Sequence, residues 1–371
     1  MAKKHLYISL SAHGFGHIGQ MAPILNKLAF EYGNQIQFTI QCQVAAEFLK
    51  SAFLFDFKHI QKSADIGMIM ANSLDVQAQQ THRAYKELHR NWSKEVQLKA
   101  REIDRVHCDL VVSNVSYLTL AAANQLNLPS IGLCSLNWAD IYYHYCRGLP
   151  GADEIHQAAV QHYQGADRFL IPAPGMPMEY LPNRMPIGPL ARLANRYPNF
   201  KQRLHLPESS KLVMVSMGGI PHKVDNRLWP KMDGVVWLDA AHGESHRPDV
   251  IPIKERGESF IDVLGHCDLL VTKPGYGLFT ESTCNGIPTL YVKRNEWPEE
   301  PYLLAWLEQY NPVSEPLNRD AFHSGDFAEP VAAMLTKLAS HKAMVPCAPT
   351  GVGQACGAIL EALEIQHIVT H

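Results

Sequence analysis

Short apolar runs alternate with longer amphipathic segments along the whole chain. Residues 6–11 form an apolar run that predicts a strand, and a glycine-rich loop at 12–19 follows it. Apolar positions within 21–29 then recur three and four residues apart, which predicts a helix. Further strands are predicted at 36–40, 109–112, 131–134, 212–216, 235–238, 268–272 and 289–292, and further helices at 75–106, 120–126 and 355–363. This alternation is typical of parallel sheets covered by helices.

Part of the pattern occurs twice. Residues 107–112 read His-Cys-Asp-Leu-Val-Val, and residues 266–271 read His-Cys-Asp-Leu-Leu-Val. In both halves, at the same interval after the aspartate, a proline opens another apolar run. The simplest cause is two α/β domains of similar topology. Prolines crowd the stretch between 171 and 207, which predicts a linker because proline interrupts helices and central strands.

Composition narrows the functional classes. The chain has 371 residues, a net charge of -3, 46% hydrophobic residues and 19% charged residues, which gives no electrostatic argument for nucleic acid as a partner. No apolar run reaches the roughly 18 residues that span a bilayer. The eight cysteines lack a Cys-x-x-Cys pair, so we expect reduced thiols in a cytoplasmic protein. The 19 histidines lack the tight spacing of metal ligands, and we expect no metal site.

The glycine-rich loop matches a dinucleotide-binding fingerprint. Gly14, Gly16 and Gly19 have the Gly-x-Gly-x-x-Gly spacing between a predicted strand and helix. A nicotinamide dehydrogenase also needs an acidic residue at the end of the second strand, to bind the ribose. That position reads Gln-Cys-Gln at 41–43, and the nearby Glu31 precedes the strand. The pattern therefore disfavours NAD.

Two histidines flank this loop. A loop at the carboxyl end of the first strand faces the ligand-binding edge of a parallel sheet. There, a neutral imidazole of His13 or His17 could take a proton from a hydroxyl. The alternative is that both histidines only cap or hydrogen-bond the loop.

The segment 272–283 holds the densest candidate site. A predicted strand ends at Thr272, the glycines allow close backbone approach, and a helix is predicted to begin near Thr280. The positive end of a helix favours a phosphate, and Glu281 could accept hydrogen bonds from a ribose diol. An ordinary turn between strand and helix is the alternative. The candidate ligand-binding residues are Gly275, Gly277, Thr280 and Glu281.

These motifs resemble a known family. The run from Asp268 through Glu281, with Gly-Ile-Pro at 286–288 and Glu-Glu at 299–300, resembles the donor-binding region of GT-B glycosyltransferases. The His-Gly-Phe-Gly-His loop, the Ser-Met-Gly-Gly turn and the Thr-Lys-Pro-Gly-Tyr-Gly run are shared with the glycosyltransferase-like domain of plant arabinokinases and its stand-alone bacterial relatives. The likeness to the bacterial peptidoglycan N-acetylglucosaminyltransferase is more distant. The resemblance covers most of the chain in order.

The resemblance implies a domain organisation. A GT-B protein is an α/β protein with two Rossmann-like domains, whose parallel sheets face each other across a cleft. We expect an acceptor-side domain at 1–188 and a donor-binding domain at 189–345. The tail at 346–371 would contain a helix that crosses back to the first domain.

The resemblance also assigns roles on the acceptor side. His17 matches the histidine that acts as the base on the acceptor hydroxyl, with His13 as the competing candidate. Relatives often carry an aspartate where this chain has Asn114, and an asparagine there would weaken the base but keep a hydrogen bond to it. The aromatic segment 137–145 is predicted to be a loop that either stacks on a sugar or lipid acceptor or packs beneath the site.

On the donor side, the matched residues extend over two turns. Gly218 and Gly219 match the turn that approaches the donor pyrophosphate, Glu281 matches the ribose ligand, and Glu299 and Glu300 match the residues that bind the sugar hydroxyls. Lys273 either stabilises the leaving diphosphate or is a solvated loop lysine.

The resemblance implies a glycosyltransferase that moves a sugar from a nucleoside-diphosphate sugar, most simply a UDP-sugar, to an unidentified acceptor. The implied transfer is inverting. Helix ends and backbone amides would hold the leaving group, so we expect no metal or other cofactor. The chain contains no Asp-x-Asp motif, which agrees with this expectation. A nucleotide-sugar epimerase or hydrolase of the same fold, or a non-catalytic nucleotide-sugar binding protein, are the alternatives. We expect a cytoplasmic location, and peripheral attachment to the inner face of a membrane stays open.

Overall fold

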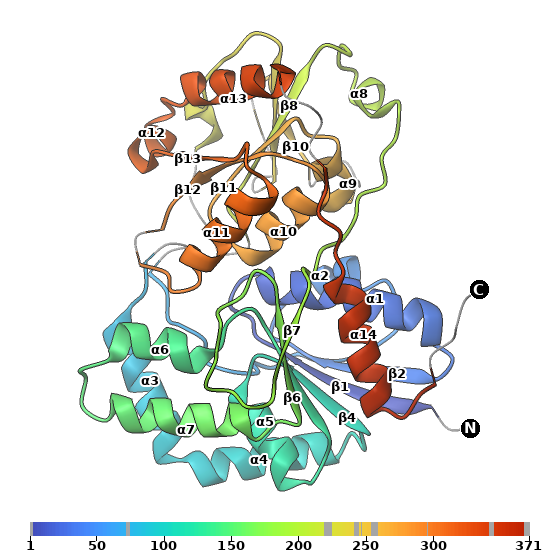
Figure 1. Ribbon diagram of the computed structural model, residues 1–371, viewed down its shortest axis with the longest axis vertical. Helices are drawn as coiled ribbons and strands as arrows, with labels where there is room; N and C mark the ends of the chain where they lie inside the picture. The colour runs from blue at the N-terminus through green and yellow to red at the C-terminus, as the bar shows by residue number, and fades with distance from the viewer. Residues whose placement is uncertain are drawn as a thin grey trace. The chain divides into compact units, whose positions relative to one another are not determined.

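The protein consists of two compact α/β units in a computed structural model, which describes residues 3–71, 75–218, 225–240, 245, 247–253, 259–294, 296–340 and 345–366 (Figure 1). Unit 1 comprises Met1–Leu190, Trp297–Glu299 and Thr350–His371, and unit 2 comprises Ala191–Glu296 and Glu300–Pro349. Each unit is built on one parallel sheet, which confirms the predicted fold class. The chain first passes from unit 1 to unit 2 after Leu190.

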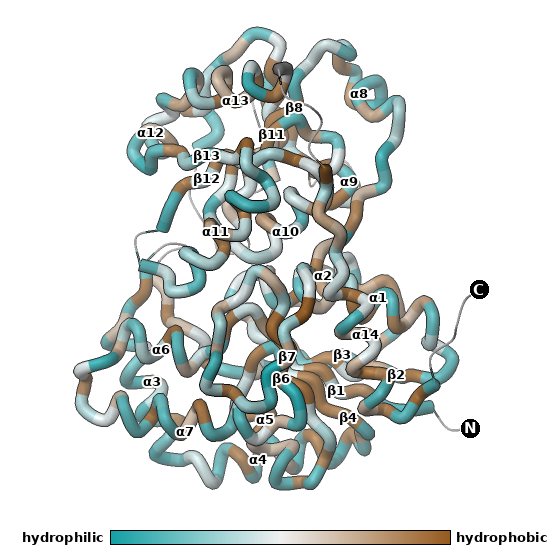
Figure 2. Tube along the Cα trace, viewed as in Figure 1, coloured by the Kyte–Doolittle hydropathy of each residue, from teal (hydrophilic) through white to brown (hydrophobic). Residues whose placement is uncertain are grey.

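Unit 1 contains a seven-stranded sheet in the order β3-β2-β1-β4-β5-β6-β7. Its central strands are buried on both faces, as parallel strands between two helical layers are, and Figure 2 shows hydrophobic residues along β1 and β4. The strands are β1 (Lys4–Leu10), β2 (Ile36–Gln41), β3 (Lys58–Ile60), β4 (Leu110–Asn114), β5 (Ser130–Leu133), β6 (Arg168–Pro172) and β7 (Arg184–Ile187). The last of these lies within the predicted linker, where an edge strand tolerates Pro186.

The helices of unit 1 differ from the prediction in two places. The expected helix at 75–106 is two helices, which meet at Asn91, where the backbone leaves the helical conformation with a φ of -104° and a ψ of 16°. The aromatic segment expected as a loop forms a helix, which is capped by the Asn137 side chain accepting from the Asp140 backbone N–H. The helices are α1 (Gly16–Tyr32), α2 (Ala46–Ala52), α3 (Ala78–Arg90), α4 (Trp92–Asp104), α5 (Tyr117–Gln125), α6 (Trp138–Cys146), α7 (Ala152–Gln164) and α14 (Gly351–Ala362).

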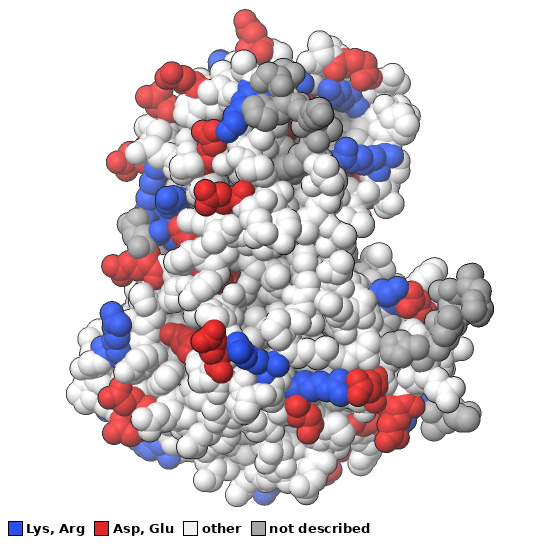
Figure 3. Space-filling model, viewed as in Figure 1, with Lys and Arg blue, Asp and Glu red and all other residues white. Residues whose placement is uncertain are grey.

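Unit 2 contains a six-stranded parallel sheet in the order β10-β9-β8-β11-β12-β13. Its strands are β8 (Lys211–Ser216), β9 (Val235–Asp239), β10 (Val250–Pro252), β11 (Leu269–Thr272), β12 (Thr289–Val292) and β13 (Glu315–Leu317). Its helices are α8 (Phe200–Arg203), α9 (Phe260–Gly265), α10 (Tyr276–Cys284), α11 (Glu300–Tyr310), α12 (Arg319–Ser324) and α13 (Ala328–Ser340), with a 3₁₀ turn at Asn226–Leu228. Lys and Arg side chains are interspersed with Asp and Glu side chains over the visible face, as the small net charge suggests (Figure 3).

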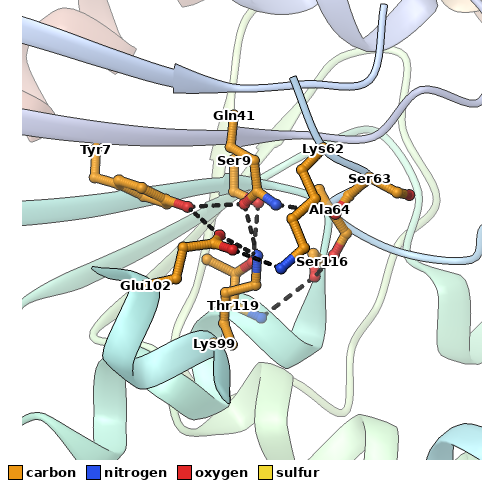
Figure 4. A network of polar contacts seen from close by, with 10 residues as sticks. All are labelled: Tyr7, Ser9, Gln41, Lys62, Ser63, Ala64, Lys99, Glu102, Ser116 and Thr119. Carbon is orange, nitrogen blue, oxygen red and sulfur yellow. Dashed lines mark hydrogen bonds and ion pairs between the residues drawn. The ribbon is translucent and has the colours of Figure 1, made fainter. Parts of the chain in front are cut away.

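A buried polar network lies at the end of β2 in unit 1 (Figure 4). Gln41 is fully buried, and its Oε1 accepts from the Tyr7 hydroxyl at 2.8 Å and from the Lys99 ammonium at 2.7 Å. Glu102 accepts from Lys99 at 2.8 Å and from Lys62 at 2.7 Å. The position where a dinucleotide-binding enzyme carries its ribose-binding acid is therefore occupied by a structural hydrogen-bond network.

Glu102→Gln is expected to lower the free energy of unfolding by about 1.5 kcal/mol at pH 7, because the buried Lys99 ammonium loses the negative charge of its hydrogen-bonded partner. Burial raises the pKa of Glu102, but the ion pairs with Lys99 and Lys62 outweigh burial and lower it overall. A depressed carboxyl pKa contributes stability above the unfolded value, near 4.5, that is lost as the pH falls further. Urea unfolding of both proteins should therefore show a difference that shrinks below pH 4.5. The exposed pair of Glu87 and Arg90 supplies the control, since Glu87→Gln should change stability little.

Candidate functional site

The strand order reverses at one place in each sheet. In unit 1 the reversal lies between β1 and β4, and in unit 2 it lies between β8 and β11 (Figure 1). Ligands of open parallel sheets bind beyond the carboxyl ends of the strands at this point. His17 follows β1 and Asn114 ends β4, whereas Gly218 follows β8 and Lys273 follows β11. The structure thus brings these candidates to the two reversal points, each within its own unit.

His17 lies in the first turn of α1 and is only 6% exposed. Its Nδ1 is 2.7 Å from the Oδ1 of Asn114, and the Sγ of Cys134 lies 3.8 Å from the same nitrogen. Burial lowers the pKa of His17 to about 4, although the bond to Asn114 opposes this shift. With this lowered pKa, the imidazole is neutral at pH 7. Because an amide oxygen only accepts, the proton of the imidazole lies on Nδ1, and Nε2 carries a lone pair.

Asn114 keeps the hydrogen bond that an aspartate would make, but without a charge. It is fully buried, and its Nδ2 donates to the Oε1 of Gln20 at 2.9 Å. The amide is therefore held in the orientation that turns its oxygen toward His17. A neutral partner does not stabilise the imidazolium form as a carboxylate would.

His13 occupies a different environment from His17. It is half-buried in the loop after β1, with its ring 5.1 Å from Trp138 in an edge-on arrangement and 6.0 Å from Trp297 in a stacked one. Trp138 also lies 5.6 Å from the His17 ring. The two histidines therefore share an aromatic neighbour, and His13 stays the competing candidate for the base.

Asp65 is a candidate that the sequence analysis missed. It follows the short strand β3, and its carboxylate accepts from the Ser11 hydroxyl and from the Trp138 indole N–H, both at 2.9 Å. Burial raises its pKa to about 6, against the effect of these hydrogen bonds. Asp65 thus connects Trp138, the aromatic neighbour of both histidines, to Ser11, just after the end of β1. A three-residue strand leaves no periodic pattern, so an isolated aspartate behind it carried no signal.

In unit 2, Lys273 is buried, which contradicts the alternative that it is a solvated loop lysine. It is 7% exposed at the end of β11. A Cβ added to Gly218, which has a φ of +79°, would lie 3.8 Å from the Lys273 Cε and 4.0 Å from its Nζ. Gly218 therefore lies beside the end of the lysine side chain. Gly219 lies outside the described residues.

The next helix begins earlier than expected. Helix α10 starts at Tyr276 rather than near Thr280, because the buried Tyr276 and Phe279 hold its first turn in place despite Gly277. Its N-cap residue is Gly275, which has no side chain to accept from the first N–H groups of the helix. The N-terminal N–H groups and the helix dipole favour an anion at this end. A Cβ at Gly277 would meet nothing within 4 Å, so there is open space beside the first turn.

Thr280 and Glu281 therefore lie in the second turn of α10. The Thr280 hydroxyl donates to the Tyr276 carbonyl oxygen at 2.9 Å and is fully buried. It is turned to the helix backbone and is not brought to the helix N-terminus. Glu281 is 4% exposed, and its Oε1 accepts from the Nε of Arg192 at 2.6 Å.

The two consecutive glutamates belong to different units. The Glu299 carboxylate, in unit 1, accepts from the Ser135 hydroxyl at 2.5 Å. The Glu300 carboxylate, in unit 2, accepts from the Arg294 backbone N–H at 3.0 and 3.2 Å. Burial raises the pKa of Glu300, while Arg294, Lys293 and Lys273 oppose this. Glu300 is therefore a buried carboxylate that three cationic side chains act on electrostatically.

Two features are absent from the residues that the structure describes. In that part of the chain, no three His, Cys, Asp or Glu side chains gather so that they could hold a metal ion. Nor is any helix there long and apolar enough to cross a membrane.

No protein-family model matches the chain. Among curated proteins, the chain is similar to L-arabinokinase of Arabidopsis thaliana, with 24% identity over 343 residues, which is 86% of this chain. The chain spans 31% of the length of that relative. The predicted resemblance to arabinokinases is confirmed, whereas the likeness to the peptidoglycan transferase stays a prediction.

Solved structures match nearly the whole chain. CalG4, the calicheamicin glycosyltransferase, is 13% identical, with a TM-score of 0.63 over 98% of this chain and 99% of that one. A UDP-glucosyltransferase from Polygonum tinctorium capable of glucosylating indoxyl is 13% identical, with a TM-score of 0.60 over 98% and 99%. A putative UDP-N-acetylglucosamine 2-epimerase from Listeria monocytogenes is 12% identical, with a TM-score of 0.53 over 99% and 100%. With a parallel sheet in each unit, the chain has the GT-B fold that these glycosyltransferases share.

Proposed function

We propose that the protein transfers a sugar from a nucleoside-diphosphate sugar, in the favoured case a UDP-sugar, to an acceptor hydroxyl. The observation that carries this proposal is the buried, neutral His17 at the reversal point of unit 1, with Nδ1 committed to Asn114. A base held in one tautomer suits the removal of a hydroxyl proton. The similarity to glycosyltransferase structures over nearly the whole chain supports the same activity.

In the proposed reaction, the acceptor oxygen attacks the anomeric carbon as its proton passes to the Nε2 of His17. The bond from the anomeric carbon to the diphosphate oxygen breaks, and the nucleoside diphosphate leaves from the opposite face with inversion. We propose that the negative charge on this leaving group is stabilised by Lys273 and by the N–H groups at the start of α10. Positive groups of the protein would then perform this step without a metal ion.

The remaining donor contacts are proposed from the positions of the carboxylates. Glu281 is held by Arg192 and would accept hydrogen bonds from the ribose diol. Glu300 is acted on electrostatically by Lys273 and would bind a sugar hydroxyl. Gly218 would let the backbone approach the diphosphate beside Lys273.

Lys273→Met is expected to weaken UDP binding by about tenfold, because one charge-assisted hydrogen bond to the diphosphate is lost. Uridine lacks phosphates, so its affinity should not change. Calorimetry with uridine, UMP, UDP, dTDP, GDP, ADP, NAD and NADP measures both effects. Wild type should prefer UDP, and Glu281→Ala should weaken every uridine ligand. Glu329→Ala, an exposed carboxylate on α13, is the matched control.

Two results would contradict the donor site. If Lys273→Met lowers the affinity for uridine and for UDP equally, the lysine does not contact the diphosphate. If NAD or NADP binds, and substitution of neither Lys273 nor Glu281 changes that affinity, the ligand site is the glycine fingerprint at Gly14.

The similarity to a putative UDP-N-acetylglucosamine 2-epimerase favours a second candidate function, epimerisation of a nucleotide-sugar. Incubating the protein with UDP-sugars, first without and then with a pool of acceptors, separates the two by NMR of the products. An epimerase changes a sugar stereocentre, whereas a transferase releases UDP in proportion to the added acceptor.

A further inference from the structure

A continuous chain of hydrogen bonds leads from His17 to a buried carboxylate in unit 1. The His17 Nδ1 is 2.7 Å from Asn114, and the Asn114 Nδ2 donates to Gln20 at 2.9 Å. The Gln20 Nε2 donates to the Ser135 hydroxyl oxygen at 2.8 Å, and this hydroxyl donates to Glu299 at 2.5 Å. Each of these side chains is at most 6% exposed.

The carboxylate fixes the direction of every bond in the chain. An ionised carboxylate only accepts, so Ser135 donates to Glu299 and accepts from Gln20. With its NH₂ group committed to Ser135, Gln20 turns its oxygen toward the NH₂ group of Asn114. The Asn114 oxygen therefore faces His17, and the proton of the imidazole stays on Nδ1.

The carboxylate is itself held in place. Its second oxygen, Oε2, accepts from the indole N–H of Trp297 at 3.2 Å. Trp297 is 7% exposed and belongs to the buried apolar cluster of unit 1 that contains Trp138. Both carboxylate oxygens thus accept hydrogen bonds, as in an ionised group. The segment 297–299 thus supplies the acceptor-only group at the end of a chain of hydrogen bonds whose other side chains are neutral.

We propose that Glu299 is a positioning residue for His17, which sets the imidazole tautomer through Ser135, Gln20 and Asn114. The catalytic meaning of this role rests on the proposed function, since it keeps Nε2 free to accept the proton of the acceptor. The role replaces the sugar contact predicted for Glu299 and leaves that contact to Glu300. It also explains how a neutral Asn114 serves where relatives use an aspartate, because the acceptor-only carboxylate lies three side chains further along.

Glu299→Gln should reverse the whole chain with almost no change in shape. A glutamine side chain has one accepting oxygen, and the indole N–H of Trp297 can only donate. The oxygen therefore turns to Trp297 and the NH₂ group faces Ser135, whose hydroxyl must then donate back to Gln20. Gln20 and Asn114 each turn over in response. An NH₂ group of Asn114 then faces the imidazole, so the proton moves to Nε2 and the base is blocked.

NMR of the protein labelled with ¹⁵N-histidine tests this at pH 7, since long-range ¹H–¹⁵N correlations distinguish the tautomers. His17→Gln assigns the signal by its loss. Wild type should show the Nδ1–H tautomer at His17, Glu299→Gln should show Nε2–H, and the neighbouring Glu300→Gln should keep Nδ1–H. Ser135→Ala breaks the chain of hydrogen bonds while keeping Glu299 itself, and it should give a mixture of tautomers.

Nδ1–H at His17 in Glu299→Gln, or Nε2–H in wild type, overturns the proposal. If Glu299→Gln does not fold, unchanged Nδ1–H in Ser135→Ala overturns it instead. In turnover, Glu299→Gln should lower kcat by about tenfold with the donor KM unchanged, which is less than the roughly 10²–10⁴-fold that a general base contributes, because the imidazole itself is still present. A raised donor KM with an unchanged tautomer would restore the sugar contact. Wild type without turnover would refute the transferase while leaving the tautomer result valid.

Discussion

His17→Ala is expected to lower kcat/KM for glycosyl transfer by about 10²–10⁴-fold, the contribution of a positioned general base. The affinity for UDP should stay at the wild-type value. His17 belongs to unit 1, whereas Lys273 and the start of α10, which we propose bind the diphosphate, belong to unit 2. The measurement is release of UDP from a UDP-sugar with a pool of acceptors, together with calorimetry of UDP binding.

His13→Ala is the matched control for this experiment. Its ring contacts Trp138 and Trp297, so the substitution removes aromatic packing from the same region while leaving the bond between His17 and Asn114 in place. We expect a smaller loss than for His17→Ala. The reverse order would assign the base to His13. No UDP release by wild type with any acceptor would favour the non-catalytic binding protein.

Much of the fold follows from local patterns in the sequence. The repeated His-Cys-Asp stretches precede β4 and β11, the strands that pair with β1 and β8 at the two reversal points. Their apolar runs predicted strands because these strands are buried on both faces. The helix ends were harder to predict, since they depend on caps and on burial. Asn137 turns an aromatic segment into α6, and the packing of Tyr276 and Phe279 starts α10 early.

The site was predictable where one motif holds a residue and its chemistry together. His17 stands in the glycine-rich loop and helix start, and Asn114 ends a recognisable strand. Gln20 and Ser135 gave no such signal, because an amide and a hydroxyl acquire a role only through partners from other elements. Their burial and pairing follow from tertiary packing, which no local pattern encodes.

Glu299 and Glu300 show the same limit most clearly. The resemblance gave both residues one role, yet the chain passes between units at this point, so consecutive carboxylates have different surroundings. One accepts from a serine of unit 1, and the other accepts from a backbone N–H of unit 2. Consecutive positions in a sequence therefore do not predict a common site where the chain leaves one domain for another.

Gly351→Ala is expected to lower the free energy of unfolding by about 3 kcal/mol, at the upper end of the effects of overpacking. Helix α14 begins at Gly351, and an added Cβ would lie 1.9 Å from the carbonyl oxygen of Gly188 and 2.6 Å from its carbonyl carbon. These are backbone atoms, so no rotation of a side chain relieves the clash. The helix start must move, and the buried Ile359 and Leu360 then lose packing in unit 1.

The same helix supplies a control of opposite sign. At Gly353, an added Cβ would meet nothing within 4 Å, so Gly353→Ala should raise stability by about 0.5–1 kcal/mol through the better helix propensity of alanine. Urea unfolding of both variants therefore compares one chemical change at two positions in one helical turn. Equal effects would show that the start of α14 does not lie against Gly188. Opposite effects would establish that α14, encoded after all of unit 2, is docked on unit 1 by backbone contact.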